Sequence, residues 1–301
     1  MAVQVSGRMP TGISSLDPVL DGGIPPGSVV LLEGDIGAGS QEFVYTSLIY
    51  LSMLRQRQDA GPGARIPDNL SYITFTRMRE DILSEIGLSF APNLVQNLNG
   101  SVAFTDLSTN YFDSSVVPSD WYSPRADGTP PGGKSAAQDK MLTELSSHLA
   151  VGRKNNILKL LYVTLSVATE EKAKKGSGCS LVVIDSLTDL ATQYTEPERW
   201  RELTAFLRGL QRVTKTWNAT VYLLLTRGVL EPSREKEIAD CVDAVAVFKW
   251  EETSAQRRQR TMFFEKFRGV MVHLEERDLV KFAVRISPGS GFEVSNIRVV
   301  V

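Results

Sequence analysis

A glycine-rich turn between an apolar run and a helical pattern is the feature that most constrains this chain. Val29–Glu33 reads VVLLE, Gly34–Gln41 reads GDIGAGSQ, and apolar residues at helical spacing follow over 41–58. A short apolar run bounded by glycines is typical of a buried strand. A strand that passes through such a turn into a helix directs backbone N–H groups and the positive end of the helix dipole at one point. This arrangement predicts a cradle for phosphate.

The glycine turn departs from the sequence of a working phosphate loop, G-x-x-x-x-G-K-[ST]. Ser40 stands in the place of the lysine, and Gln41 stands in the place of the serine or threonine. A hydrogen bond to a charged group contributes about 1.5–3 kcal/mol, so the loss of the lysine alone is expected to weaken nucleotide binding by roughly one to two powers of ten. A tight turn that binds no ligand is the alternative interpretation. The candidate binding residues of this loop are Gly34, Gly37, Ala38, Gly39, Ser40 and Gln41.

Apolar runs elsewhere in the chain alternate with helical patterns. Leu181–Asp185 (LVVID) and Thr220–Leu225 (TVYLLL) are nearly continuous, as in parallel strands that are buried on both faces. Four consecutive strand patterns occupy 243–300. We therefore expect an α/β fold, in which a mainly parallel twisted sheet is flanked by helices and carries an antiparallel C-terminal β extension. The remaining predicted elements are strands over 71–77 and 102–107 and helices over 80–88, 138–175 and 199–216.

We expect a single domain over residues 1–301, with an irregular insertion. Segment 108–140 predicts this insertion because it is rich in Pro, Ser, Asp and Gly. Within it, Gly128–Ser135 (GTPPGGKS) matches the phosphate-loop pattern letter for letter. No apolar run precedes this match, and its two prolines lack the N–H groups that would bind phosphate, so we interpret it as a chance match. The alternative is that this loop folds over a nucleotide and brings Lys134 to it.

The N-terminal stretch makes the prediction more specific. Residues 11–28 read TGISSLDPVLDGGIPPGS and lead directly into the glycine turn. This stretch resembles the start of the KaiC-like branch of the RecA-superfamily ATPases, whose pattern is T-G-x-x-x-L-D-x-x-L-x-G-G-x-P-x-G-S followed by the phosphate loop. The similarity continues at Asp185-Ser186, at Ala239-Asp240 and at Lys266–Gly269, which is similar to the family's K-x-R-G segment. The resemblance covers nearly the whole chain outside 108–140. It implies a RecA-like P-loop NTPase fold and an archaeal-type regulatory or signal-transduction role.

The catalytic glutamates of that family are missing from this sequence. In the family they end the second strand in a pattern like T-F-E-E, whereas Thr76 and Arg77 occupy those positions here. Hydrolysis needs a carboxylate that orients the attacking water and cations that stabilise the transferring phosphoryl group. We therefore predict a degenerate site with no catalytic residues and no metal site of its own, which binds ATP weakly or not at all and Mg²⁺ only with a nucleotide. The alternative is an active ATPase with a non-standard phosphate loop, in which Arg77 or Lys134 replaces the missing cation.

Three further polar residues match positions of the family's site. Asp185 ends the strand that resembles the family's magnesium-side strand, where it either holds a water-bound metal or caps a nearby turn. The resemblance implies that Lys266 and Arg268 reach the phosphates of a neighbouring subunit. They are two residues apart and share one face of a strand, which also suits plain exposed residues. We therefore expect a homo-oligomer, or a hetero-oligomer with an active RecA-like relative, acting through assembly.

The overall composition argues against several classes of protein. The chain has 33 Lys+Arg and 35 Asp+Glu and a net charge of −2, which gives no electrostatic case for binding nucleic acid or a membrane surface. The basic run Arg257–Arg260 is accordingly interpreted as a solvated turn. Two cysteines do not make a disulfide framework, and no apolar run approaches the ~20 residues of a membrane span. Because the N-terminus lacks the apolar core of a signal peptide, we expect a cytoplasmic protein.

Overall fold

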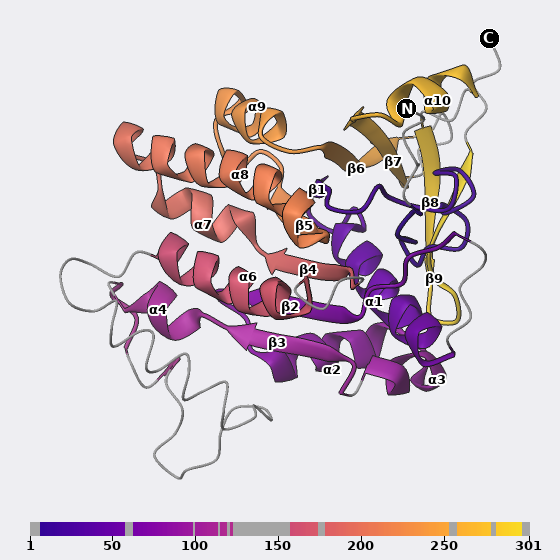
Figure 1. Cartoon of the computed structure of the whole chain (residues 1–301), viewed down its shortest axis with the longest axis horizontal. Coiled ribbons are helices and arrows are strands. Elements are labelled where there is room, and N and C mark those ends of the chain that lie inside the picture. The colour runs from indigo at the N-terminus through magenta and orange to yellow at the C-terminus, as the bar shows by residue number, and fades with distance from the viewer. Residues whose placement is uncertain are drawn as a thin grey trace.

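The strands that the structure describes form a single sheet (Figure 1). The computed structural model describes residues 7–57, 63–98, 100–113, 115–118, 121–122, 157–173, 178–252, 258–277 and 281–296. In these residues the sheet has nine strands in the order β3-β2-β4-β5-β1-β6-β7-β8-β9. The strands are β1 (Val29–Gly34), β2 (Asn69–Thr74), β3 (Val102–Asp106), β4 (Ser180–Asp185), β5 (Ala219–Thr226), β6 (Ala244–Glu252), β7 (Arg258–Phe267), β8 (Lys281–Ser287) and β9 (Gly291–Asn296). The six strands from β3 to β6 are parallel, and β7, β8 and β9 are antiparallel. The predicted mainly parallel sheet with an antiparallel C-terminal extension is confirmed.

Helices cover both faces of the parallel part of the sheet. Along β1, Val30 and Leu32 pack in one apolar core with the helix that follows the glycine turn, whereas Val29 and Leu31 pack in a second core with the helices after β3. Figure 1 shows α6, α7 and α8 together on one side, with α1, α2 and α3 on the other. The helices are α1 (Ser40–Arg57), α2 (Arg79–Ser89), α3 (Pro92–Val95), α4 (Ser108–Phe112), α6 (Ile157–Ala173), α7 (Leu187–Gln193), α8 (Pro197–Trp217), α9 (Pro232–Asp240) and α10 (Met271–Glu276), with a 3₁₀ turn at Gln96–Leu98. Because strand side chains alternate between faces, each central strand is apolar throughout.

The N-terminal motif packs against α1 and has structural reasons for its residue types. The Thr11 hydroxyl donates to Asp17 Oδ1 at 2.7 Å, and the Ser47 hydroxyl of α1 donates to the Thr11 carbonyl at 2.5 Å. Gly23 has φ 128°, and a Cβ there would lie 2.0 Å from the Met9 carbonyl oxygen. A side chain at this position would therefore disrupt the backbone bridge between Met9 and Ile24.

Two of the boundaries that differ from the predictions have a clear cause in the packing and hydrogen bonds. Helix α4 occupies 108–112, the start of the segment predicted to be irregular, because buried Leu107 and the packing of Tyr111 on Phe75 anchor this turn to the core. Strand β2 ends at Thr74 rather than at residue 77, because the Thr74 hydroxyl bonds to the backbone of Arg77 and turns the chain. The Gly128–Ser135 match and Lys134 lie outside the described residues. Across the part of the chain that the structure describes, no helix is both long and apolar enough to cross a membrane.

Candidate functional site

The glycine turn connects β1 to α1 at the carboxyl edge of the sheet. Strand β1 lies between β5 and β6, and the helix begins directly at Ser40. Gly37 and Gly39 have φ of 72° and 113°, values that L side chains rarely adopt. A Cβ on Gly34 would lie 2.7 Å from Ser40 Oγ. The glycines are therefore required by the backbone path, and they leave the start of an 18-residue helix facing the edge where a parallel sheet binds ligands.

The C-terminal strands hold the outer side of this turn. Trp250 on β6 donates its indole N–H to the Ile36 carbonyl at 3.1 Å, and its backbone N–H donates to Asp35 Oδ2 at 3.3 Å. Arg260 on β7 donates Nε–H to the Gly37 carbonyl at 3.0 Å, and its guanidinium lies 4.4 Å from the centre of the Trp250 ring. The basic run interpreted as a solvated turn therefore places one arginine against the glycine turn. This contact could not be predicted from local sequence patterns, because 223 positions separate its two residues.

Asp185 lies at the end of β4 and has hydrogen-bond donors at both of its carboxylate oxygens. The Tyr72 hydroxyl donates to Oδ2 at 2.6 Å, and Gln41 donates its amide N–H to Oδ1 at 3.3 Å. The guanidinium of Arg77 lies 3.6 Å from Oδ2. Only 4% of the Asp185 surface is exposed, and this burial raises the pKa of the carboxyl, while the Tyr72 hydrogen bond and the charge of Arg77 act in the opposite direction. The structure thus brings together Gln41 and Asp185, two predicted site residues, and adds Tyr72.

Arg77 forms further contacts that fix its position. It bonds to the Glu85 carboxylate on α2 and donates to the Tyr45 hydroxyl of α1 at 3.0 Å. Burial raises the pKa of Tyr45, so this side chain stays a neutral phenol. Arg77 is therefore bound within the protein by two carboxylates, Glu85 and Asp185, and does not extend toward the glycine turn as a free cation.

This arrangement does not fit a bound Mg²⁺ ion. A working site holds the ion between the hydroxyl of the phosphate loop and an aspartate. Here the group that replaces the hydroxyl, Gln41, points an N–H at Asp185, and Arg77 adds a positive charge beside it. Both would repel a cation. Among the described residues there is also no cluster of three or more His, Cys, Asp or Glu that would bind a metal.

Lys266 and Arg268 lie near the amino ends of the parallel strands, whereas the glycine turn lies at their carboxyl ends. Lys266 pairs with Val245 near the start of β6, whereas the turn bonds to Phe248 and Trp250 further along the same strand. The Lys266 ammonium donates to the carbonyls of Ala239 and Asp240 at 2.8 and 3.0 Å and so caps the end of α9. Arg268 is half-exposed and lies 4.0 Å from Asp243. Neither side chain serves the glycine turn of its own chain.

Comparison of the structure with solved structures identifies the fold. A crystal structure of a KaiC-like protein from the hyperthermophilic archaeon Pyrococcus horikoshii OT3 matches with a TM-score of 0.54, covering 96% of this chain and 98% of that chain. The chain has a KaiC-like RecA fold. The sequences are 16% identical, so this similarity concerns the fold alone. Residues 8–61, which contain the N-terminal motif, β1 and the glycine turn, match the model of a family of unknown function, DUF7125. No curated protein matches the chain.

Proposed function

We propose that this protein is a KaiC-like ATPase homologue with a degenerate nucleotide site, and that it acts in regulation or signal transduction through assembly rather than through ATP hydrolysis. The observation that carries this proposal is the state of Asp185. Its two oxygens are engaged by Tyr72 and Gln41, and Arg77 supplies the neighbouring positive charge. The carboxylate that a working relative needs for Mg²⁺ is thus satisfied within the protein.

Three further losses support the same proposal. Ser40 carries no charge to stabilise the transferring phosphoryl group, and Gln41 offers no hydroxyl to Mg²⁺. Thr76 and Arg77 occupy the positions of the carboxylates that would orient or deprotonate water. The backbone cradle and the start of α1 remain, so ATP is expected to bind weakly and with little dependence on Mg²⁺.

An active ATPase with a non-standard phosphate loop is the second candidate. Arg260 supports it, because its Nε lies 3.0 Å from the Gly37 carbonyl and its guanidinium supplies a positive charge beside the turn. In this case Arg260 replaces the lysine of the phosphate loop. Arg77, which the sequence suggested for this role, is bound to Glu85 and Asp185 instead.

The first prediction is that purified protein releases phosphate from ATP and Mg²⁺ no faster than the background rate. The reason is the joint loss of cation, metal ligand and base. A colorimetric phosphate assay of the wild type and of Asp185→Asn, which has the same shape without the charge, is expected to give equal, background rates. Turnover that requires Mg²⁺ and disappears in Asp185→Asn contradicts the proposal, and turnover that disappears in Arg260→Ala establishes the second candidate.

The proposed assembly rests on where Lys266 and Arg268 lie. Because they are at the edge of the sheet opposite to their own glycine turn, any contact with phosphates is a contact with those of another subunit. We therefore propose that the protein forms a homo-oligomer, or a hetero-oligomer with an active RecA-like relative, through a face that contains Lys266, Arg268 and Gly269. In such an assembly the partner's site holds ATP, and this chain completes that site with Lys266 and Arg268.

The second prediction is that the double variant Lys266→Ala, Arg268→Ala loses assembly. Light scattering on the wild type and the variant, with and without ATP and the relative, measures this. Lys159→Ala is the control, since Lys159 is an exposed lysine of α6, a helix that packs on β4 and α8 rather than on β7. A wild type that stays monomeric under all conditions, or a double variant that assembles as the wild type does, refutes the proposed face.

A further inference from the structure

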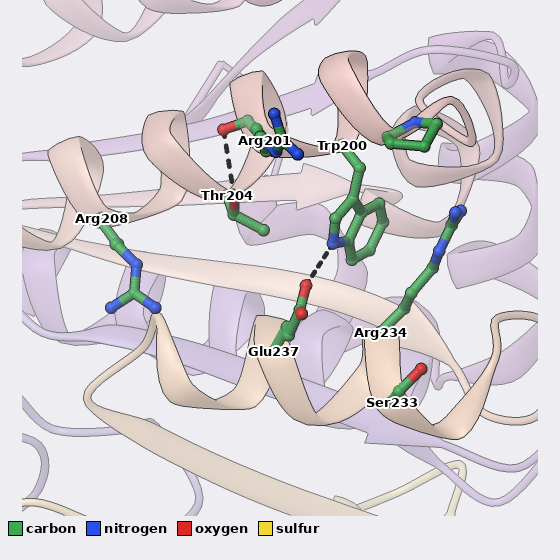
Figure 2. Close-up of a pocket in the computed structure, with 8 residues that line it drawn as sticks. Trp200, Arg201, Thr204, Arg208, Ser233, Arg234 and Glu237 are labelled. Carbon is green, nitrogen blue, oxygen red and sulfur yellow. Dashed lines mark hydrogen bonds between the residues drawn. The ribbon is translucent and has the colours of Figure 1, made fainter.

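A groove lies between α8 and α9, on the outer side of the helix layer. It encloses about 440 Å³ and is lined from α8 by Trp200, Arg201, Thr204 and Arg208 and from α9 by Ser233, Arg234 and Glu237. Figure 2 shows the two helices side by side, with Arg208 at one end of the groove and Arg234 at the other. Three of the lining residues are cationic and one is anionic. The groove is therefore positively charged in a protein whose net charge is −2.

The single lining carboxylate is already bound. Glu237 accepts a hydrogen bond from the Trp200 indole N–H, and the dashed line in Figure 2 marks this contact across the groove. Trp200 is buried, and the guanidinium of Arg234 lies 4.8 Å from the centre of its ring. These three residues join α8 to α9 and form a fixed floor. The surface that a ligand contacts is thus preformed, so little side-chain entropy of the protein is lost when the ligand binds.

The cations of the groove are available to a ligand to different degrees. Arg201 is exposed, and its guanidinium has no hydrogen bond or ion pair with the residues that the structure describes. Arg208 pairs with Asp240 at 3.1 Å, but both side chains are about 60% exposed, so this pair is readily exchanged for another carboxylate. The Thr204 hydroxyl lies between them on α8 and donates to the Arg201 carbonyl at 3.1 Å, and Ser233 lies beside Arg234 on α9.

We propose that this groove binds an acidic peptide segment of a partner protein in an extended conformation. Arg201 and Arg208 are seven residues apart on one helix, which separates them by roughly 10 Å along its axis. About three residues of extended chain span this distance, so carboxylates of one peptide segment meet both guanidinium groups. Guanidinium groups bind carboxylates through paired N–H donors, and arginine and tryptophan are enriched where proteins bind one another.

This inference goes beyond the proposed function and does not depend on it. The groove lies on α8 and α9, and none of its residues belongs to the glycine turn or to the Asp185 cluster. Its acidic ligand is recognised without nucleotide or Mg²⁺. An extended peptide is favoured over nucleic acid because the positive charge is confined to one short groove, whereas the wider surfaces of α8 and α9 also carry Glu198, Glu202 and Glu235.

The test is the binding of fluorescein-labelled hexaglutamate to the whole protein, measured by fluorescence anisotropy without ATP or Mg²⁺. We expect hexaglutamate to bind and hexaglutamine to bind at least tenfold more weakly, with affinity falling as salt is raised. Arg201→Glu is expected to weaken the binding of hexaglutamate about tenfold, because it replaces an electrostatic attraction by a repulsion. Arg212→Glu is the matched control, since Arg212 is exposed on the same helix and does not line the groove, and it is expected to stay within twofold of the wild type.

Two results overturn this inference. One is hexaglutamate binding that is absent, or that Arg201→Glu and Arg212→Glu weaken equally. The other is an oligothymidylate that binds more tightly than hexaglutamate with the same sensitivity to Arg201→Glu, which assigns the groove to nucleic acid. Neither result changes the phosphate-release rates that test the proposed function, so the two can fail separately.

Discussion

Replacing Ser40 with lysine and Gln41 with threonine is expected to tighten ATP binding by about 10- to 100-fold. The lysine adds a charge-assisted hydrogen bond to the phosphates, which contributes about 1.5–3 kcal/mol. The threonine cannot reach Asp185 as Gln41 does, so it removes the amide N–H that now occupies Oδ1. Isothermal titration with ATP, in the presence and absence of Mg²⁺, measures both effects. The affinity of the double variant for ATP is expected to depend on Mg²⁺, whereas that of the wild type is expected to be independent of Mg²⁺.

The matched control is Ser40→Met with Gln41→Thr, which supplies the length of a lysine without its charge. This variant is expected to bind ATP within about threefold of the wild type, because the phosphates gain no cation. Equal gains from lysine and methionine would show that the turn does not hold phosphate at all. The glycine turn would then be a purely structural connection between β1 and α1.

Tighter binding is not expected to bring hydrolysis. The variant still has Thr76 and Arg77 at the end of the second strand, and Arg77 still contacts Asp185 and Glu85. No carboxylate is introduced there to orient water, so the nucleotide is held without being turned over. Binding and catalysis are thus lost through different residues of this chain, and they are separable by substitution.

The central strands could be predicted from sequence because burial on both faces leaves one readable pattern. Leu181–Asp185 and Thr220–Leu225 fall within β4 and β5, which extend beyond them by one residue and two residues. The start of β7 was less predictable. Arg258 and Arg260 belong to that strand, but a run of charged residues is typical of an exposed turn as well as of a strand end. Their place became clear only from the pairing of Trp250 with Arg260 across β6 and β7.

The residues of the candidate site could be predicted, but not the contacts among them. The motif spacing identified Gln41, Asp185 and Arg77 one by one. The hydrogen bond from Tyr72 to Asp185 joins residues 113 positions apart, and it exists because β2 and β4 are neighbours in the sheet. Tyr72 lies within the predicted strand over 71–77, and its hydroxyl becomes a site group only when the strand order is known. Sequence patterns report burial and local period, whereas these contacts depend on topology.

Asp243→Ala is expected to lower the free energy of unfolding by about 2–4 kcal/mol. Asp243 is buried directly before β6, where its Oδ2 accepts hydrogen bonds from the Val29 backbone N–H at 2.9 Å and from the Lys215 ammonium at 2.6 Å. Oδ1 accepts the Gln211 amide at 3.1 Å. The substitution leaves the buried N–H at the start of β1 without its acceptor and removes a link between α8 and two central strands. Urea unfolding followed by circular dichroism measures the change.

Two controls separate the buried hydrogen bonds of Asp243 from charge in general. Asp243→Asn keeps an acceptor for Val29 and is expected to lose about half as much stability. Asp240→Ala removes a carboxylate whose pair with Arg208 is exposed, and it is expected to cost less than about 1 kcal/mol. Equal losses of unfolding free energy in all three variants would mean that the buried hydrogen bonds of Asp243 do not stabilise the start of β1 and β6. Since Arg268 also approaches Asp243, a large loss in Asp243→Ala means that assembly through Lys266 and Arg268 must be tested in variants that leave Asp243 in place.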